Sequence, residues 1–164
     1  MGKIIEQSVE MVSARYAASG IHLTVNVPLN LPTVACHEIE ISQSLVNLLN
    51  NAFDAIDGDS RSERWVRVQV SIQPTADSDD SIERMTIEVV DGGPGVAVKD
   101  RDRLMQPFFT TKEVGSGIGI GLSISREIAV RHGGELELRE CDGHTCFRLT
   151  LPLQRVEQTE EVTV

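Results

Sequence analysis

The stretch that most constrains the fold covers residues 41–56, because it can form a helix with two different faces. Apolar residues recur there at steps of three and four and predict a buried side: Ile41, Leu45, Leu48, Leu49, Ala52, Phe53 and Ile56. A second row at the same spacing is polar: Gln43, Asn47, Asn50, Asn51 and Asp54. Asn is a mediocre helix former, whereas solvated helix faces usually carry Lys and Glu. Because amide oxygens suit Mg²⁺ that already carries phosphate oxygens, the row predicts a ligand-binding face; the alternative is a polar face packed against a loop.

The composition is typical of a soluble globular domain. The chain has 164 residues, of which 40% are hydrophobic and 24% charged, enough for one domain with a core. The net charge of −10 argues against a nucleic-acid partner and against an anionic membrane surface. Since no apolar run approaches the roughly 20 residues of a membrane span, we expect a soluble cytoplasmic domain, compatible with a full-length protein anchored in the inner membrane.

The three cysteines indicate a reducing compartment rather than a disulfide framework. Cys141 and Cys146 flank the sequence Asp-Gly-His-Thr and raise the alternative of a zinc site. Their spacing does not fit a structural zinc knuckle, and a second Cys/His pair is missing from the sequence. A hairpin with its turn at Asp142 and Gly143 is therefore the preferred interpretation.

Periodicity predicts alternating helices and strands along the chain. The expected order is helix 4–18, strand 21–27, a helix from residue 38, strands 65–72 and 84–90 as a hairpin, helix 98–105, helix 119–131, and a last hairpin of strands 135–140 and 145–151. Residues 106–117 are expected to form a loop, and residues 154–164 a flexible acidic tail.

Glycines between residues 91 and 121 predict a phosphate site. The run Gly115-Ser-Gly-Ile-Gly-Ile-Gly121 precedes a helix, and its free amides and the helix N-terminus favour an anion. The run does not match the dinucleotide fingerprint, and the sequence contains no P-loop. Asp91 ends a strand beside the turn Gly-Gly-Pro-Gly, where its carboxylate can accept a hydrogen bond from an amine such as that of adenine. Lys112 follows two threonines and can reach a terminal phosphate. Taken singly, each signal has an ordinary alternative: Asp91 could belong to a common turn, the glycine run could be a flexible helix start, and Lys112 could be a solvated lysine.

These motifs resemble, in sequence and in order, the ATP-binding catalytic domain of sensor histidine kinases, which shares its family with gyrase, a heat-shock chaperone and mismatch-repair ATPases. NLLNNA at 47–52 resembles the N box, DGGPGV at 91–96 the first glycine box, PFFTTK at 107–112 the phenylalanine box and GIGIGLSIS at 117–125 the second glycine box. The resemblance covers residues 38–152. It implies a two-layer α/β sandwich of the Bergerat type: a mixed sheet of about five strands with about three helices on one face.

The resemblance also implies a role for each matching residue. Asn51 would bind Mg²⁺, with Asn47 supporting the metal or its water, and Asp91 would bind the adenine amino group. Asn47 and Lys112 are the expected catalytic residues. The other expected nucleotide-binding residues are Asp54, Gly93, Gly95, Val96, Phe108, Thr110, Thr111, Lys112, Gly117, Ile118, Gly119, Ile120, Gly121 and Leu122.

The resemblance further implies transfer of phosphate rather than hydrolysis of ATP. Asn47 stands where the hydrolysing relatives carry a glutamate base, so nothing obvious activates water and transfer to a protein side chain is favoured. His37 precedes Glu38 as an acceptor histidine would, but Ile41 stands where the family tends to have proline. We therefore expect the acceptor histidine, and through it a response regulator, on a separate dimerisation domain.

The expected organisation has a junction helix at 1–20, a catalytic domain at 21–153 and the tail at 154–164. Two alternatives share the fold: a stand-alone serine kinase of the anti-sigma-factor type and a degenerate nucleotide-binding pseudokinase. The stretch from PFFTTK to GLSIS favours the sensor kinase over the serine kinase. Intact Asn51, Asp91 and glycine run argue against the pseudokinase.

Overall fold

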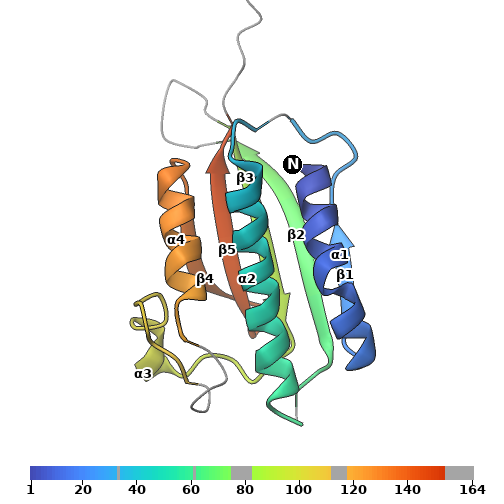
Figure 1. Cartoon of the computed structure of the whole chain (residues 1–164), viewed down its shortest axis with the longest axis vertical. Coiled ribbons are helices and arrows are strands. Elements are labelled where there is room, and N and C mark those ends of the chain that lie inside the picture. The colour runs from blue at the N-terminus through green and yellow to red at the C-terminus, as the bar shows by residue number, and fades with distance from the viewer. Residues whose placement is uncertain (33, 61, 75–82, 112–117, 154–164) are drawn as a thin grey trace, which may run out of the picture.

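In the computed structural model, whose described residues are 1–32, 34–60, 62–74, 83–111 and 118–153, three helices cover one face of a five-stranded sheet (Figure 1). The strands are β1 (His22–Asn26), β2 (Trp65–Pro74), β3 (Glu83–Asp91), β4 (Glu135–Cys141) and β5 (His144–Pro152). The covering helices are α1 (Gly2–Ala18), α2 (Glu38–Asp57) and α4 (Gly121–Arg131), and the short helix α3 spans Val98–Arg101. The predicted two-layer α/β sandwich is confirmed for the described residues.

The sheet is mixed, with strand order β1-β2-β3-β5-β4. β1 pairs with β2 in parallel, and the other pairs are antiparallel. Val66, Val68 and Val70 alternate with polar residues and are buried, because the period of two in a strand turns them all toward the helices. The register places Asp91 of β3 between Val66 of β2 and Thr145 of β5, so it belongs to the same helix-covered face.

The core lies between this face and the helices, and α2 provides its centre. All the apolar positions predicted for residues 41–56 are at most 3% exposed, and Ile41, Leu48 and Ile56 are completely buried. Burying one such side chain stabilises a fold by about 1.5–3 kcal/mol, which explains why this helix stays in place despite its asparagines. None of the described helices combines the length and the apolar character that crossing a membrane requires.

Helix α1 packs against α2 and contributes to the same core. Ile4, Ile5 and Val12 are buried, and the Tyr16 hydroxyl donates a hydrogen bond of 2.6 Å to the carbonyl of Leu49. The Arg15 guanidinium lies 3.7 Å from the centre of the Phe53 ring. The first helix thus covers the sheet beside edge strand β1, and its additional role as a junction to another domain stays a prediction.

Two helices are shorter than their sequence patterns predict. Helix α4 begins at Gly121 instead of Gly119, because Gly119 has a φ of 71°, which an α-helix does not accommodate. Helix α3 ends at Arg101 instead of Met105. The chain continues in tight turns, one of which is closed by a hydrogen bond from the Gln106 N–H to the Arg103 carbonyl. Residues 75–82, between the two strands of the predicted hairpin, and the predicted tail at 154–164 lie outside the described residues.

Candidate functional site

The amide row of α2 faces a cavity of about 350 Å³ at the start of α4. The segment after α3 and the residues leading into α4 form its other walls. Most of the predicted site residues are brought together here; the described lining is Asn47, Asn50, Asn51, Asp54, Leu104, Phe109, Thr110, Thr111, Ile118, Gly119, Ile120, Gly121 and Leu122. The predicted Lys112 and Gly117 lie outside the described residues.

Asn47 joins α2 to the first turn of α4. Its Nδ2 donates to the Gly121 carbonyl at 3.2 Å and to Ser125 Oγ at 3.3 Å. Ser125 is fully buried and donates to the same Gly121 carbonyl at 2.9 Å, so the three groups form a closed set of contacts. The side chain predicted to be catalytic therefore also fixes the position of the helix N-terminus that borders the cavity.

The other members of the amide row are engaged differently. Arg15 of α1 donates to Asn50 Oδ1 at 3.2 Å and to Asp54 Oδ1 at 2.8 Å. No described residue makes a hydrogen bond with the side chain of Asn51, which is half-buried and lines the cavity. Asn51 thus offers an amide oxygen to a ligand in this cavity, and such a hard oxygen donor suits Mg²⁺.

Asp91 ends β3 beneath α2 and is 1% exposed. Burial raises the pKa of Asp91 to about 6, although the Gly93 N–H, which donates to Oδ1 at 2.9 Å, and nearby His144 both act to lower it. Burial and then the charge of Asp91 raise the pKa of Tyr16. A desolvated carboxylate with one backbone donor is well suited to accept a further hydrogen bond from an amine.

The turn after Asp91 needs glycine because α2 approaches it closely. A Cβ on Gly93 would lie 2.6 Å from Asp91 Oδ1 and 3.2 Å from the Cβ of Ala55. Gly95 has a φ of 83° and, with Val96, lines a second cavity of about 850 Å³ that also includes Met105. The predicted site residues therefore divide between two cavities, while buried Asp91 lines neither.

The segment around the phenylalanines packs against the start of α4. A Cβ on Gly119 would lie 2.5 Å from the Phe109 carbonyl oxygen, so only glycine fits. The Arg103 guanidinium lies 4.7 Å from the centre of the Phe109 ring. Phe108 is 75% exposed with a φ of 65°, and Ile118 is 70% exposed, so Phe108 lies outside the cavity that Phe109 lines.

Sequence reasoning missed three residues of the site region. Thr145 lies opposite Asp91 in the β3–β5 register, Ser125 completes the Asn47 contact, and Arg15 holds Asp54. The alternation of β5 could have placed Thr145 on the helix-covered face, but its pairing depends on a strand register that the sequence does not display. Ser125 and Arg15 lie 78 and 39 residues from their partners, and no local pattern indicates such contacts.

Comparison with known proteins identifies relatives over nearly the whole chain. Residues 36–155 match the family described as histidine kinase-, DNA gyrase B-, and HSP90-like ATPase. The C4-dicarboxylate transport sensor protein DctB of Rhizobium meliloti is 32% identical over 151 residues, which cover 92% of this chain and 22% of DctB. The sensor protein FixL of Bradyrhizobium diazoefficiens is 34% identical, over 93% of this chain and 28% of FixL. The sensory histidine kinase/phosphatase NtrB of Escherichia coli O157:H7 is 31% identical, over 93% of this chain and 43% of NtrB. The chain thus spans less than half the length of these relatives.

Solved structures agree with this placement. The mycobacterial sensor histidine kinase MprB superposes with a TM-score of 0.73 at 24% identity, covering 94% of this chain and 96% of that one, which shows the fold. Full-length ShkA, solved in complex with AMPPNP, gives a TM-score of 0.72 at 27% identity and covers 92% of this chain and 29% of that one. The chain belongs to the histidine kinase-, DNA gyrase B- and HSP90-like ATPases, an ATP-binding family, and its sequence relatives include two sensor proteins and a sensory histidine kinase/phosphatase.

Proposed function

We propose that this chain is the catalytic module of a sensor histidine kinase, which binds Mg-ATP and transfers the γ-phosphate to a histidine on a separate dimerisation domain. The observation that carries the proposal is the unengaged amide of Asn51 on the cavity that Asn47 and the N-terminus of α4 border. The same geometry suits an anionic ligand with a metal ion, because backbone amides at a helix start favour phosphate.

Each residue of the site has a distinct task in this proposal. Asn51 holds Mg²⁺, which neutralises phosphate charge when bound, and Asp91 accepts the adenine amine. The backbone at Gly119 and Gly121 faces the phosphates, and Asn47 keeps the start of α4 in place. Lys112 would contact the terminal phosphate. Catalysis then consists of positioning and charge neutralisation rather than covalent chemistry of this chain.

Phosphotransfer is favoured over hydrolysis by the lining of the cavity. Among its described residues, Asp54 is the carboxylate, and its Oδ1 is paired with Arg15 at 2.8 Å. A general base must reach the proton it removes, and this ion pair holds Asp54 toward α1 instead. The proposed reaction is therefore transfer to a protein acceptor.

The acceptor histidine is proposed to lie outside this chain. His37 donates its backbone N–H to His132 Nε2 at 3.0 Å, and these two residues join the start of α2 to the end of α4. His144 stacks edge-on against Trp65 with ring centres 4.9 Å apart, and His22 lies in edge strand β1. None of these four histidines lines the 350 Å³ cavity that the amide row of α2 faces. This function requires two partners, a dimerisation domain and a response regulator, and we place the reaction in the cytoplasm.

Titration with a fluorescent ATP analogue and Mg²⁺ tests the nucleotide site. We expect Asn51→Ala and Asp91→Asn each to weaken binding by about 10- to 100-fold, since each loses a charge-assisted or metal contact worth about 1.5–3 kcal/mol. Gln43→Ala is the matched control, because Gln43 is an exposed amide on the same helix that does not line this cavity. Unchanged affinity in both test variants would contradict the assigned site.

Phosphotransfer from labelled ATP to a separately produced dimerisation domain tests the reaction. We expect an acid-labile, alkali-stable product, as for phosphohistidine, and no transfer by the Asn51→Ala variant. An acid-stable phosphoserine on a protein partner would instead support the stand-alone serine kinase.

A further inference from the structure

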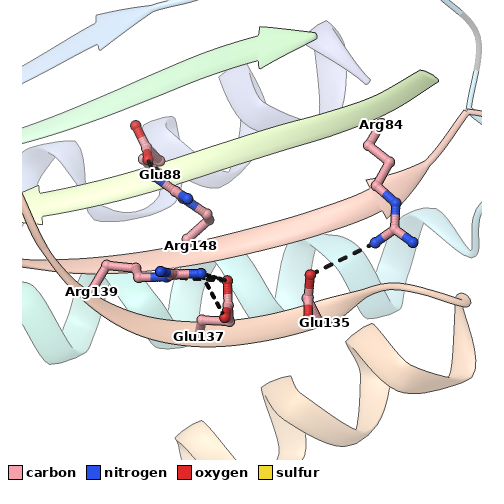
Figure 2. A network of polar contacts seen from close by, with 6 residues as sticks. All are labelled: Arg84, Glu88, Glu135, Glu137, Arg139 and Arg148. Carbon is pink, nitrogen blue, oxygen red and sulfur yellow. Dashed lines mark hydrogen bonds and ion pairs between the residues drawn. The ribbon is translucent and has the colours of Figure 1, made fainter. Parts of the chain in front are cut away.

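Two cysteines and a glutamate meet on the face of the sheet that the helices leave uncovered. The register places Glu88 of β3 opposite Arg148 of β5, and Cys146 opposite Arg139 of β4. Cys141 ends β4 and is directly followed by the hairpin turn, in which Asp142 has a φ of 53° and Gly143 a φ of 83°. The predicted hairpin is therefore present, and it brings both cysteines to one face. Figure 2 shows Glu88 of this cluster beside Arg148, and Arg139 bonded to Glu137.

The three side chains lie close enough to share one ion. One ligand atom each from Glu88, Cys141 and Cys146 lies within 4.8 Å of the other two. Cys146 is fully buried, whereas Cys141 and Glu88 are half-buried, so the cluster opens to solvent on one side. We propose that Cys141, Cys146 and Glu88 form a site for a thiophilic divalent cation such as Zn²⁺, with a fourth position open to water. Thiolate and carboxylate ligands in a tetrahedral arrangement suit Zn²⁺.

The charges around the cluster permit a cation. Arg148 donates through both Nε and Nη2 to Oε1 of Glu88, at 2.9 and 2.7 Å, which leaves Oε2 available to a metal. Arg139 is held by Glu137 through bonds of 2.9 and 3.0 Å (Figure 2). Each arginine is thus neutralised by a carboxylate, and the two cysteine thiolates balance the charge of the metal. Binding forms two metal–sulfur bonds and releases the two thiol protons to solvent.

The strand register favours a metal over a disulfide. Cys141 pairs with His144 and Cys146 pairs with Arg139, so the two cysteines are diagonal neighbours. The Cα atoms of diagonal neighbours lie roughly 7–8 Å apart, beyond the usual range of a disulfide. Two zinc–sulfur bonds of about 2.3 Å span a wider gap than a single sulfur–sulfur bond.

Titration of the reduced, nucleotide-free chain with Co²⁺ and with Zn²⁺ tests the proposal. We expect one equivalent to bind, with the intense visible bands and the sulfur charge-transfer absorbance of tetrahedral thiolate-bound Co²⁺. Cys141→Ser removes the half-buried thiolate ligand and should weaken Co²⁺ binding more than about 100-fold. This loss is larger than the one expected when only a hydrogen-bond partner of a metal ligand is removed. Glu88→Gln should weaken it about tenfold, since an amide oxygen is a poorer ligand.

Cys36→Ser is the matched control, because Cys36 lies before α2 and outside the cluster. It should bind Co²⁺ as the parent chain does, and circular dichroism should show that every variant keeps its fold. Failure of the parent chain to bind, or equal binding by Cys141→Ser, would overturn the proposal. A Cys141–Cys146 disulfide formed in air, with no metal binding after reduction, would also overturn it. The ATP-analogue titration is independent of these outcomes.

Discussion

Asp91 carries an energetic cost in the nucleotide-free protein. Burial raises its pKa to about 6 from an ordinary 3.8, so the folded state holds the proton more tightly than the unfolded chain. The stability that protonation supplies is fully present below about pH 4 and is lost as the pH rises through about 6. At pH 7.5 the buried carboxylate therefore costs on the order of 3 kcal/mol.

Asp91→Asn should remove that cost while weakening nucleotide binding. We expect urea unfolding to show a gain on the order of 3 kcal/mol at pH 7.5 that vanishes near pH 4, because asparagine can keep the bond from Gly93 without a buried charge. Asp57→Asn, on the exposed end of α2, serves as the control and should change little at either pH. A loss of stability at pH 7.5 equal to that at pH 4 would contradict this account of Asp91.

Gly119→Ala should cost more than a positive φ alone explains. Gly119 and Gly20 have φ values of 71° and 64°, but only a Cβ on Gly119 meets backbone, the Phe109 carbonyl oxygen at 2.5 Å. We expect Gly20→Ala to lose about 1–2 kcal/mol of stability, and Gly119→Ala to lose more and to weaken ATP-analogue binding. Urea unfolding and the nucleotide titration measure both effects. If both variants lost the same stability and Gly119→Ala still bound the ATP analogue normally, the segment around Phe109 would have moved to accommodate the new Cβ at no cost in free energy.

At the scale of the elements, the contact between α1 and α2 includes the buried hydroxyl of Tyr16. Tyr16 is 1% exposed and donates to the Leu49 carbonyl at 2.6 Å. Tyr16→Phe should destabilise the domain by about 1 kcal/mol, the net value of a typical intramolecular hydrogen bond. Urea unfolding measures it, with Ser13→Ala, an exposed position on the same helix, as control. A Tyr16→Phe variant as stable as the parent would mean that this hydrogen bond adds nothing to the net stability of the α1–α2 contact.

The helices differ in how far the sequence predicted them, for physical reasons. The long apolar period of residues 41–56 determined the buried face of α2, because no other structure buries all those positions. The start of α4 was predicted too early, because glycine is compatible with both helical and left-handed backbone and only tertiary contact with Phe109 decides between them. Motif order predicted which residues would serve the nucleotide. It could not show that Asn50 and Asp54 are engaged by Arg15 while Asn51 is not.

At the scale of the whole molecule, strand order predicts a gradient of stability. β3 and β5 each have a paired strand on both sides, whereas β1 pairs only with β2 among the described strands. Hydrogen exchange at increasing urea should show amides of Ile87 and Val89 opening only with global unfolding, and amides of β1 exchanging at least about tenfold faster. Equal protection of β1 and β3 would mean that the sheet opens as one unit. The sequence predicted the strands themselves, but this gradient follows from an order that no local pattern encodes.

The contact of Asn47 with α4 has a consequence for the evolution of this family. A glutamate at this position, the general base of the hydrolysing relatives, cannot donate to the Gly121 carbonyl and would place negative charge against it. It would also remove the Asn47 Nδ2 hydrogen bond that the Oγ of fully buried Ser125 now accepts. In this chain the substitution is therefore epistatic: its effect depends on the residues at the start of α4. We therefore expect Asn47→Glu alone to lower the stability of this chain, unless the start of α4 changes with it.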